Sequence, residues 1–129
     1  MEQEVILLDT SILIEYFRKK DKSKSYLIKL SEINKKFAVS TITQFEIYTG
    51  APADQIEIWD NLFKTVNILP VTSEVALIAA GINTNLKKLN KQINLADLFI
   101  AATALQNKIP CATLNKKHFE RISELHLVD

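Results

Sequence analysis

The stretch EVILLDTSILIEYFRKK, residues 4–20, contains two different apolar patterns. In residues 4–9 the apolar residues are consecutive and bounded by charges, which is typical of a buried strand in a parallel sheet. After Ser11 the apolar residues recur at the spacing of a helix: Ile12, Leu13, Tyr16 and Phe17. The stretch therefore predicts a buried strand that leads directly into an amphipathic helix, with Asp9 at the junction.

The rest of the chain repeats this alternation. Short apolar runs predict strands at residues 37–40, 66–71 and 110–114, and 125–128 is a candidate for a short fifth strand. Helical patterns lie between them, at residues 25–35, 41–51, 53–64, 73–92 and 94–108. Strands that alternate with helices are joined by right-handed crossovers, which produce a parallel sheet with helices on both faces. The predicted fold class is therefore α/β, a three-layer α/β/α sandwich with a central parallel sheet of four to five strands.

Length and composition agree with one folded domain spanning residues 1–129. Apolar residues make up 47% of the 129 residues, which is enough to form a core. No apolar run approaches the roughly 18 residues of a membrane span, and the acidic, short N-terminal pattern does not resemble a secretory signal. Cys111 is the single cysteine, which fits a reducing compartment. We therefore expect a cytoplasmic protein without a membrane-spanning segment.

Several common classes of site are excluded by the motif search. The chain has only two glycines, so it lacks the glycine-rich loops of dinucleotide and P-loop sites. Its one cysteine and two distant histidines do not have zinc-site spacing. Cys111 lies in a predicted buried strand, and we interpret it as a core residue.

Net charge is +1, so the overall charge does not indicate a nucleic-acid binder. Local basic groups occur at residues 18–24, in the helix near Lys87, Lys88 and Lys91, and at residues 116–121. Each group taken alone is typical of a solvated helix face.

Three carboxylates stand apart from the other charges. Asp9 is the only charge between Glu4 and Glu15, and Asp97 is the only charge between Lys91 and Lys108. Glu46 is the only charge between residues 36 and 54. The helical spacing predicts that Glu46 shares an apolar face with three neighbours: Ile42, Phe45 and Thr49.

Each acid also has a structural interpretation. Asp9 could cap the first helix. Asp97, three positions after Asn94, could be stabilised by the positive end of its helix dipole. Glu46 could pair with a buried lysine or arginine. All three, however, are predicted at the sheet edge where the strands have their carboxyl ends, which is where open parallel sheets bind ligands. Converging carboxylates repel one another, and a hard divalent cation relieves that repulsion. The pattern therefore favours a Mg²⁺ site, with Mn²⁺ as an alternative.

Four segments together resemble the PIN-domain ribonucleases, most closely the toxin subunits of VapBC-type toxin–antitoxin pairs. The segments are LLDTSILIEYF with Asp9, VSTITQFEIYTGA with Glu46, NLADLFIAATAL with Asp97, and CATLNKKHF with Thr113. The resemblance covers nearly the whole chain. It departs at Asn115, where many relatives have an aspartate and others an asparagine, and at His118, where some relatives have an acid. These departures leave open whether one or two ions bind.

The resemblance implies metal-dependent endonucleolytic cleavage of RNA. Asp9 and Asp97 would hold the ion, with Glu46 direct or through water. Ser11 and Thr113 would orient the ligands, with Asn115 as a weak ligand. Lysines of the basic groups would contact phosphates: Lys87, Lys88, Lys116 and Lys117.

The resemblance also implies partners. Relatives form homodimers and bind a small VapB-type antitoxin, one segment of which lies in a groove formed by early helices, giving a heterotetramer or a larger assembly. Four aromatic residues are candidate contacts, although core packing explains each of them as well: Tyr16, Phe17, Tyr26 and Trp59. The RNA substrate and the antitoxin are not identified by the sequence.

Two other functions are alternatives. A non-catalytic PIN-fold module that holds RNA or a partner would explain Asn115 as a decayed acidic position. A phosphoacceptor signalling domain has similar length and alternation, but it needs an acidic pair after the first strand and an aspartate after the third, and the chain has neither.

Overall fold

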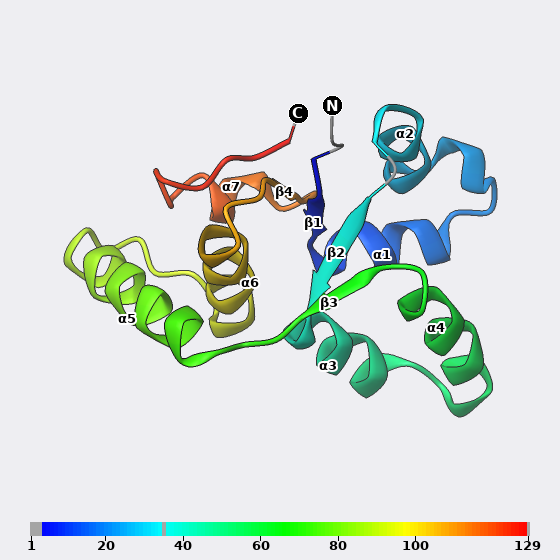
Figure 1. Ribbon diagram of the computed structural model, residues 1–129, viewed down its shortest axis with the longest axis horizontal. Helices are drawn as coiled ribbons and strands as arrows, with labels where there is room; N and C mark the ends of the chain where they lie inside the picture. Colours follow the sequence, from blue (N-terminus) through cyan, green and yellow to red (C-terminus); the bar gives the residue numbers. More distant parts are fainter. Residues whose placement is uncertain (1–3, 35, 129) are drawn as a thin grey trace.

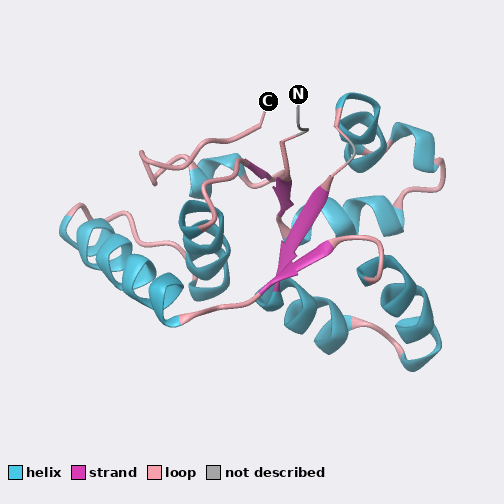
Figure 2. Cartoon of the chain, viewed as in Figure 1, coloured by secondary structure: helices cyan, strands magenta, loops and turns pink. Residues whose placement is uncertain are grey.

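The computed structural model describes residues 4–34 and 36–128. Its centre is a parallel sheet with the strand order β3-β2-β1-β4. The strands are short: β1 (Ile6–Leu8), β2 (Phe37–Ser40), β3 (Asn67–Leu69) and β4 (Cys111–Ala112). The α/β/α sandwich with a parallel sheet is confirmed (Figures 1 and 2).

The helices connect the strands and cover both faces of the sheet (Figure 1). One group is α1 (Thr10–Arg18), α2 (Tyr26–Ile33), α3 (Thr41–Gly50) and α4 (Ile56–Phe63), with 3₁₀ turns at Lys22–Lys24 and Ala53–Gln55. The other group is α5 (Ser73–Lys88), α6 (Leu95–Gln106) and the short α7 (Lys116–Phe119). No helix within the described residues has the length and apolar character needed to cross a membrane.

Alternation along the strands divides the core into two layers. Ile6 and Leu8 of β1 pack with α1, α2 and α4, whereas Leu7 between them packs with α6 and α7. Successive side chains of a strand point to opposite faces, so a fully apolar strand is needed when both faces are covered. The consecutive apolar run of residues 4–9 therefore reflects burial on both sides.

The predicted fifth strand is reduced to one parallel bridge between Cys111 and Leu127. The predicted helix over 73–92 ends at Lys88, because Asn90 takes a positive φ of 55° and the Lys91 N–H donates to the Leu86 carbonyl at 2.8 Å. This is the hydrogen-bond pattern of a helix terminated by a left-handed residue. Of the helix predicted over 25–35, the last residue lies outside the described residues.

The start of α3 also differs from the prediction. Thr41 and Gln44 have capping-box spacing, but the N-cap is Ser40, whose hydroxyl accepts from the Ile42 N–H at 3.0 Å. Thr41 instead accepts a hydrogen bond from the Val71 N–H at 3.3 Å. The helix ends at Gly50, one residue before the end of the predicted range 41–51.

Candidate functional site

The carboxyl ends of β1, β2 and β4 lead into α1, α3 and the α7 segment, so this edge gathers residues from distant parts of the chain. Asp9 follows β1 and is 3% exposed, and Asp97 lies in the first turn of α6 and is 8% exposed. We call Asp9 and Asp97 the acid pair. Glu46 lies in the second turn of α3 and is half-buried.

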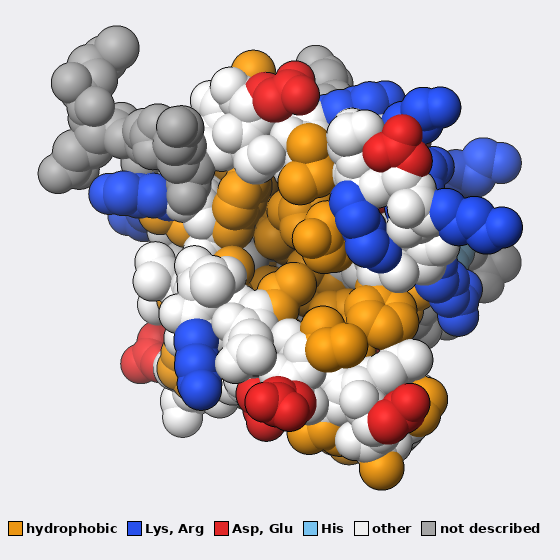
Figure 3. Space-filling view, turned by 90° about the vertical axis from the view of Figure 1, so that its right-hand side faces the viewer, with side chains coloured by type: hydrophobic (Ala, Val, Ile, Leu, Met, Phe, Trp, Pro, Cys, Tyr) orange, Lys and Arg blue, Asp and Glu red, His pale blue; other side chains and the backbone are white. Residues whose placement is uncertain are grey.

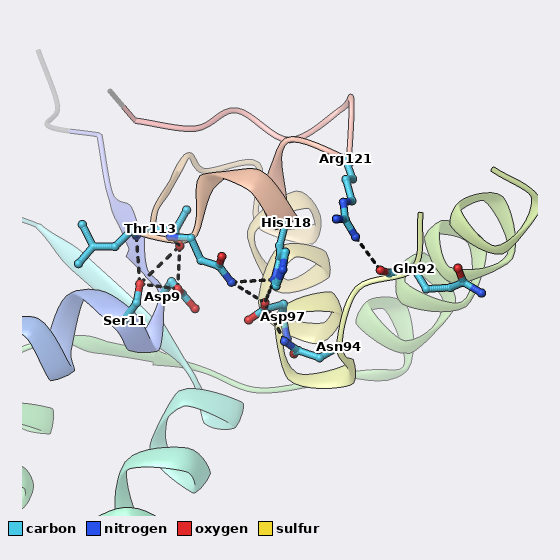
Figure 4. Close-up of polar contacts among 10 residues, drawn as sticks. Asp9, Ser11, Gln92, Asn94, Asp97, Thr113, His118 and Arg121 are labelled. Atoms are coloured by element: carbon cyan, nitrogen blue, oxygen red, sulfur yellow. Dashed lines mark hydrogen bonds and ion pairs between the residues drawn. The ribbon is translucent and has the colours of Figure 1, made fainter. Parts of the chain in front are cut away.

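Two hydroxyl groups hold Asp9. Ser11 Oγ donates to Asp9 Oδ2 at 2.7 Å, and Thr113 Oγ1 donates to the same oxygen at 2.8 Å (Figure 4). Asp9 occupies the N-cap position of α1, but its side chain makes no capping hydrogen bond. Ser11 Oγ also accepts from the Leu114 N–H at 3.0 Å. The two hydroxyls therefore orient Asp9 and fasten the segment after β4 to the start of α1, and the capping interpretation of Asp9 is wrong.

Asp97 has three side-chain neighbours, and together these four residues form the Asp97 cluster. Asn94 caps α6: its Oδ1 accepts from the Asp97 N–H at 2.8 Å, and its Nδ2 donates to Asp97 Oδ2 at 3.0 Å. Asn115 Nδ2 also donates to Asp97 Oδ2, at 3.2 Å, and His118 Nδ1 lies 3.3 Å from this oxygen. Figure 4 shows Asn94 and His118 approaching Asp97 from two different segments. Asp97 is therefore both part of a capping arrangement and a centre of side-chain contacts.

Glu46 is held by a hydroxyl group rather than by a basic residue. Thr10 Oγ1 donates to Glu46 Oε1 at 2.6 Å and lies 3.0 Å from Thr43 Oγ1. The predicted apolar face of α3 is wrong, because Phe45 is 67% exposed and the buried residues of this helix are Thr43 and Ile47. Glu46 therefore lies against the start of α1, because its partner Thr10 is the first residue of that helix and directly follows Asp9.

The acid pair has an unfavourable electrostatic environment. Burial raises the pKa of Asp9 above its usual value, and the charge of Asp97 raises it further, while hydrogen bonds from Ser11 and Thr113 lower it. In the described part of the chain, neither acid has a lysine or arginine within ion-pair distance, and the nearest nitrogen of a basic side chain is His118 Nδ1, 3.3 Å from Asp97 Oδ2. A buried pair of carboxylates without such a partner fits a cation in both charge and donor type.

The carboxylates are not gathered around one point. Within residues 4–34 and 36–128, no three His, Cys, Asp or Glu side chains are close enough to hold an ion between them. Cys111 is fully buried, and burial together with the charges of the acid pair raises the pKa of its thiol. The interpretation of Cys111 as an unreactive core residue is thereby supported.

With this geometry described, the chain can be compared with known proteins. Residues 6–125 match the PIN domain. The chain belongs to the PIN-domain family. A curated relative named ribonuclease VapC1, from Methanocaldococcus jannaschii, is 38% identical over 98% of this chain and 87% of its own length.

Solved structures of the same family agree with the fold of this PIN domain. VapBC-1 from nontypeable Haemophilus influenzae superposes with a TM-score of 0.82 at 27% identity and covers 97% of each chain. A toxin–antitoxin complex from Klebsiella pneumoniae gives a TM-score of 0.76 at 27% identity, over 93% of this chain and 94% of the other. The resemblance to VapC-type PIN domains inferred from the four motifs is therefore confirmed.

The predicted phosphate-binding lysines of the PIN domain fall into two separate places. Lys116 and Lys117 directly follow Asn115 and line a cavity of about 400 Å³ that also includes Thr113. Lys87 and Lys88 lie in the last turn of α5, which extends away from the sheet (Figure 1). The first two lysines thus share a cavity with Thr113 and Asn115, which contact the acid pair. The other two are at the far end of a projecting helix.

Sequence reasoning did not include four polar residues of this PIN-domain site: Thr10, Thr43, Asn94 and His118. Asn94 has a recognisable signal, because an N-cap asparagine followed three residues later by an acid has capping-box spacing. His118 was noted only as a departure from relatives. Its contact with Asp97 depends on how the α7 segment folds back over α6, which no local pattern encodes.

Proposed function

We propose that this PIN domain is a metal-dependent endoribonuclease that acts as the toxin of a VapBC-type pair. The observation that carries the proposal is the buried acid pair without a lysine or arginine partner. Relatives that bear the name ribonuclease VapC match nearly the whole chain, which supports RNA as the substrate. The reaction is hydrolysis of a phosphodiester bond.

The residues divide into ligands and the groups that orient them. Asp9 and Asp97 would hold Mg²⁺ or Mn²⁺, with Glu46 contributing through a water molecule. A bound ion of this kind lowers the pKa of a water molecule and offsets the charge that develops on phosphate oxygens. Ser11 and Thr113 fix the Asp9 carboxylate, and Asn94 fixes Asp97. Lys116 and Lys117 would contact phosphates of the RNA.

The proposal predicts RNA cleavage that stops when a chelator removes divalent ions and returns when Mg²⁺ or Mn²⁺ is added. Loss of the ion removes both water activation and charge neutralisation, so activity should fall at least about a hundredfold. Cleavage of a defined RNA by the purified chain would be measured with and without chelator. Asp97→Asn, purified in parallel, serves as the control for a contaminating nuclease. Chelator-resistant cleavage, or full activity in a folded Asp97→Asn variant, would refute the assignment.

The proposed antitoxin partner fits an apolar hollow formed by α1 and α3, with Trp59 of α4 in its wall. A cavity of about 310 Å³ is lined by apolar side chains that include Phe17, Ile47 and Trp59, and it reaches Glu46. Phe17 and Trp59 stack with their ring centroids 5.0 Å apart. Figure 3 shows hydrophobic side chains gathered in a hollow, with Lys and Arg side chains along one side of it. Trp59 is only 4% exposed, so it belongs to the core as well as to the wall of the hollow.

Binding of the antitoxin in the hollow can be tested with a substitution at Gly50, because a Cβ added there meets no atom within 4 Å. Gly50→Trp should fill the hollow and weaken binding of a VapB-type antitoxin by about tenfold or more, as expected for loss of a central pocket. Gly81→Trp in α5 is the matched control, since that position is equally open. Binding would be measured by calorimetry. If Gly50→Trp and Gly81→Trp both bind the antitoxin as tightly as the wild type does, the partner binds elsewhere.

A further inference from the structure

His118 gives the site a type of donor atom that the carboxylates do not provide. Its Nδ1 lies 3.3 Å from Asp97 Oδ2, and its side chain is 39% exposed (Figure 4). The chain's only other histidine is His126, which is exposed and lies near the C-terminal end of the described chain. His118 is therefore the one imidazole in contact with the acid pair in the described part of the chain.

The hydrogen bonds of Asn115 define which atoms face the centre of the Asp97 cluster. Asn115 Nδ2 lies 2.8 Å from His118 Nδ1 and 3.2 Å from Asp97 Oδ2. An amide NH₂ group only donates, so in this arrangement Nδ1 accepts and the imidazole proton is on Nε2. The amide nitrogen thus lies between two lone pairs, one on nitrogen and one on oxygen.

A divalent cation would satisfy the same two lone pairs at once. Rotation of the Asn115 amide would then turn its oxygen, which is a suitable ligand, toward the ion. Imidazole nitrogen is a ligand of first-row transition ions. Mg²⁺ instead prefers oxygen ligands and loses its bound water molecules reluctantly. The donor set of Asp97 Oδ2, His118 Nδ1 and Asn115 Oδ1 is therefore a mixed nitrogen and oxygen set.

We infer that His118 is a metal ligand of this PIN domain and that it makes the site selective for Mn²⁺ over Mg²⁺. The inference rests on the proposed function, because the ion is the one that Asp97 would hold. The carboxylates provide only oxygen ligands, so they alone would not produce this preference for Mn²⁺.

The position of His118 is set by packing rather than by the side chain itself. The next residue, Phe119, is fully buried among core residues, and the His118 N–H donates to the Asn115 carbonyl at 3.2 Å. Arg121 Nη1 donates to the Gln92 carbonyl at 2.8 Å, which ties the segment after α7 to the segment before α6 (Figure 4). The imidazole is thus mounted on a fixed turn that faces Asp97.

The test is a direct measurement of nitrogen bound to Mn²⁺. The chain, labelled with ¹⁵N-histidine, is loaded with Mn²⁺ and studied by pulsed electron paramagnetic resonance. The wild type and His126→Ala should show a nitrogen coupling, and His118→Ala should not. By calorimetry, His118→Ala should lower the affinity for Mn²⁺ about ten- to hundredfold and change the affinity for Mg²⁺ much less. His118→Asp, which restores an oxygen donor, should reduce the preference for Mn²⁺.

The possible failures are distinct. If Mn²⁺ binds but no nitrogen coupling appears, or if the coupling persists in His118→Ala, the role of His118 is refuted and the proposed ribonuclease function stands. If the affinities for both ions fall equally in His118→Ala, the selectivity is refuted. If neither ion binds the wild type and RNA is cleaved in chelator, the proposed function itself is wrong.

Discussion

Asp9→Asn is expected to abolish RNA cleavage while making the metal-free protein more stable. The asparagine keeps an oxygen that can accept from Ser11 and Thr113, so the hydrogen bonds that hold position 9 can persist. The negative charge needed to hold the cation is lost, and we expect cleavage to fall about a thousandfold or more, which corresponds to about 4 kcal/mol. Removing a buried charge should stabilise the fold by about 1–2 kcal/mol.

The stability difference has a defined dependence on pH. The pKa of Asp9 is raised above 3.8 in the folded chain, mainly by burial, so the protonated form is the one that folding favours. The stabilising contribution of Asp9 is present below about pH 3.8 and is lost as pH rises through the raised folded pKa. The advantage of Asp9→Asn should therefore be absent in strong acid, grow through that pKa and remain constant at neutral pH.

Urea unfolding in chelator, followed across this pH range, measures the effect directly. Addition of Mn²⁺ should stabilise the wild type by mass action and Asp9→Asn much less. Asp54→Asn, a substitution at an exposed acid, is the control. A metal-free Asp9→Asn variant that is less stable than the wild type at neutral pH would show that the carboxylate is paired with a group that stabilises its charge.

Phe119→Ala is expected to lower the free energy of unfolding by about 3–5 kcal/mol, a large part of the stability of a domain of this size. Phe119 is fully buried, and it packs with residues of β1, α6 and the C-terminal segment. Truncation removes a ring and leaves a cavity that close-packed neighbours fill only partly.

Phe45→Ala is the matched control, because Phe45 is 67% exposed and should change stability by no more than about 0.5 kcal/mol. Both would be measured by urea unfolding in chelator. In Phe119→Ala the Asn115–His118 turn also loses its anchor, so affinity for Mn²⁺ should fall as well. Equal stabilities of the two variants would mean that α7 does not contribute to the cooperative core.

The sequence predicted the alternation of strands and helices because burial on both faces leaves a strong local pattern, as in residues 4–9. It also located Asp9, Glu46 and Asp97, because an isolated charge in an apolar segment is visible without a structure. The face of α3 was predicted wrongly since Phe45, although apolar, is exposed. A hydrophobic stripe identifies a buried face only when its residues pack against the core of the same chain.

The connections among site residues were less predictable. The contact of Thr10 with Glu46 depends on the pairing of β1 with β2, and that of Ser11 with Thr113 depends on the pairing of β1 with β4, from opposite ends of the chain. The strands are also shorter than the apolar runs that predicted them. Apolar side chains at the rims of the sheet are buried by helices without joining its hydrogen-bonded ladder.

The hydrogen bond between Thr113 and Asp9 joins residues that are 104 positions apart. During synthesis, the first acid emerges long before the hydroxyl that orients it, and before the turn that carries His118. Long-range pairings of this kind form late, because the intervening chain must first be made and then ordered. A growing polypeptide therefore contains Asp9, Glu46 and Asp97 before β4 has joined the sheet and brought Thr113 to Asp9. The order in which the chain is made therefore delays assembly of the contacts around Asp9 and Asp97 until the segment with Thr113 and His118 has been translated.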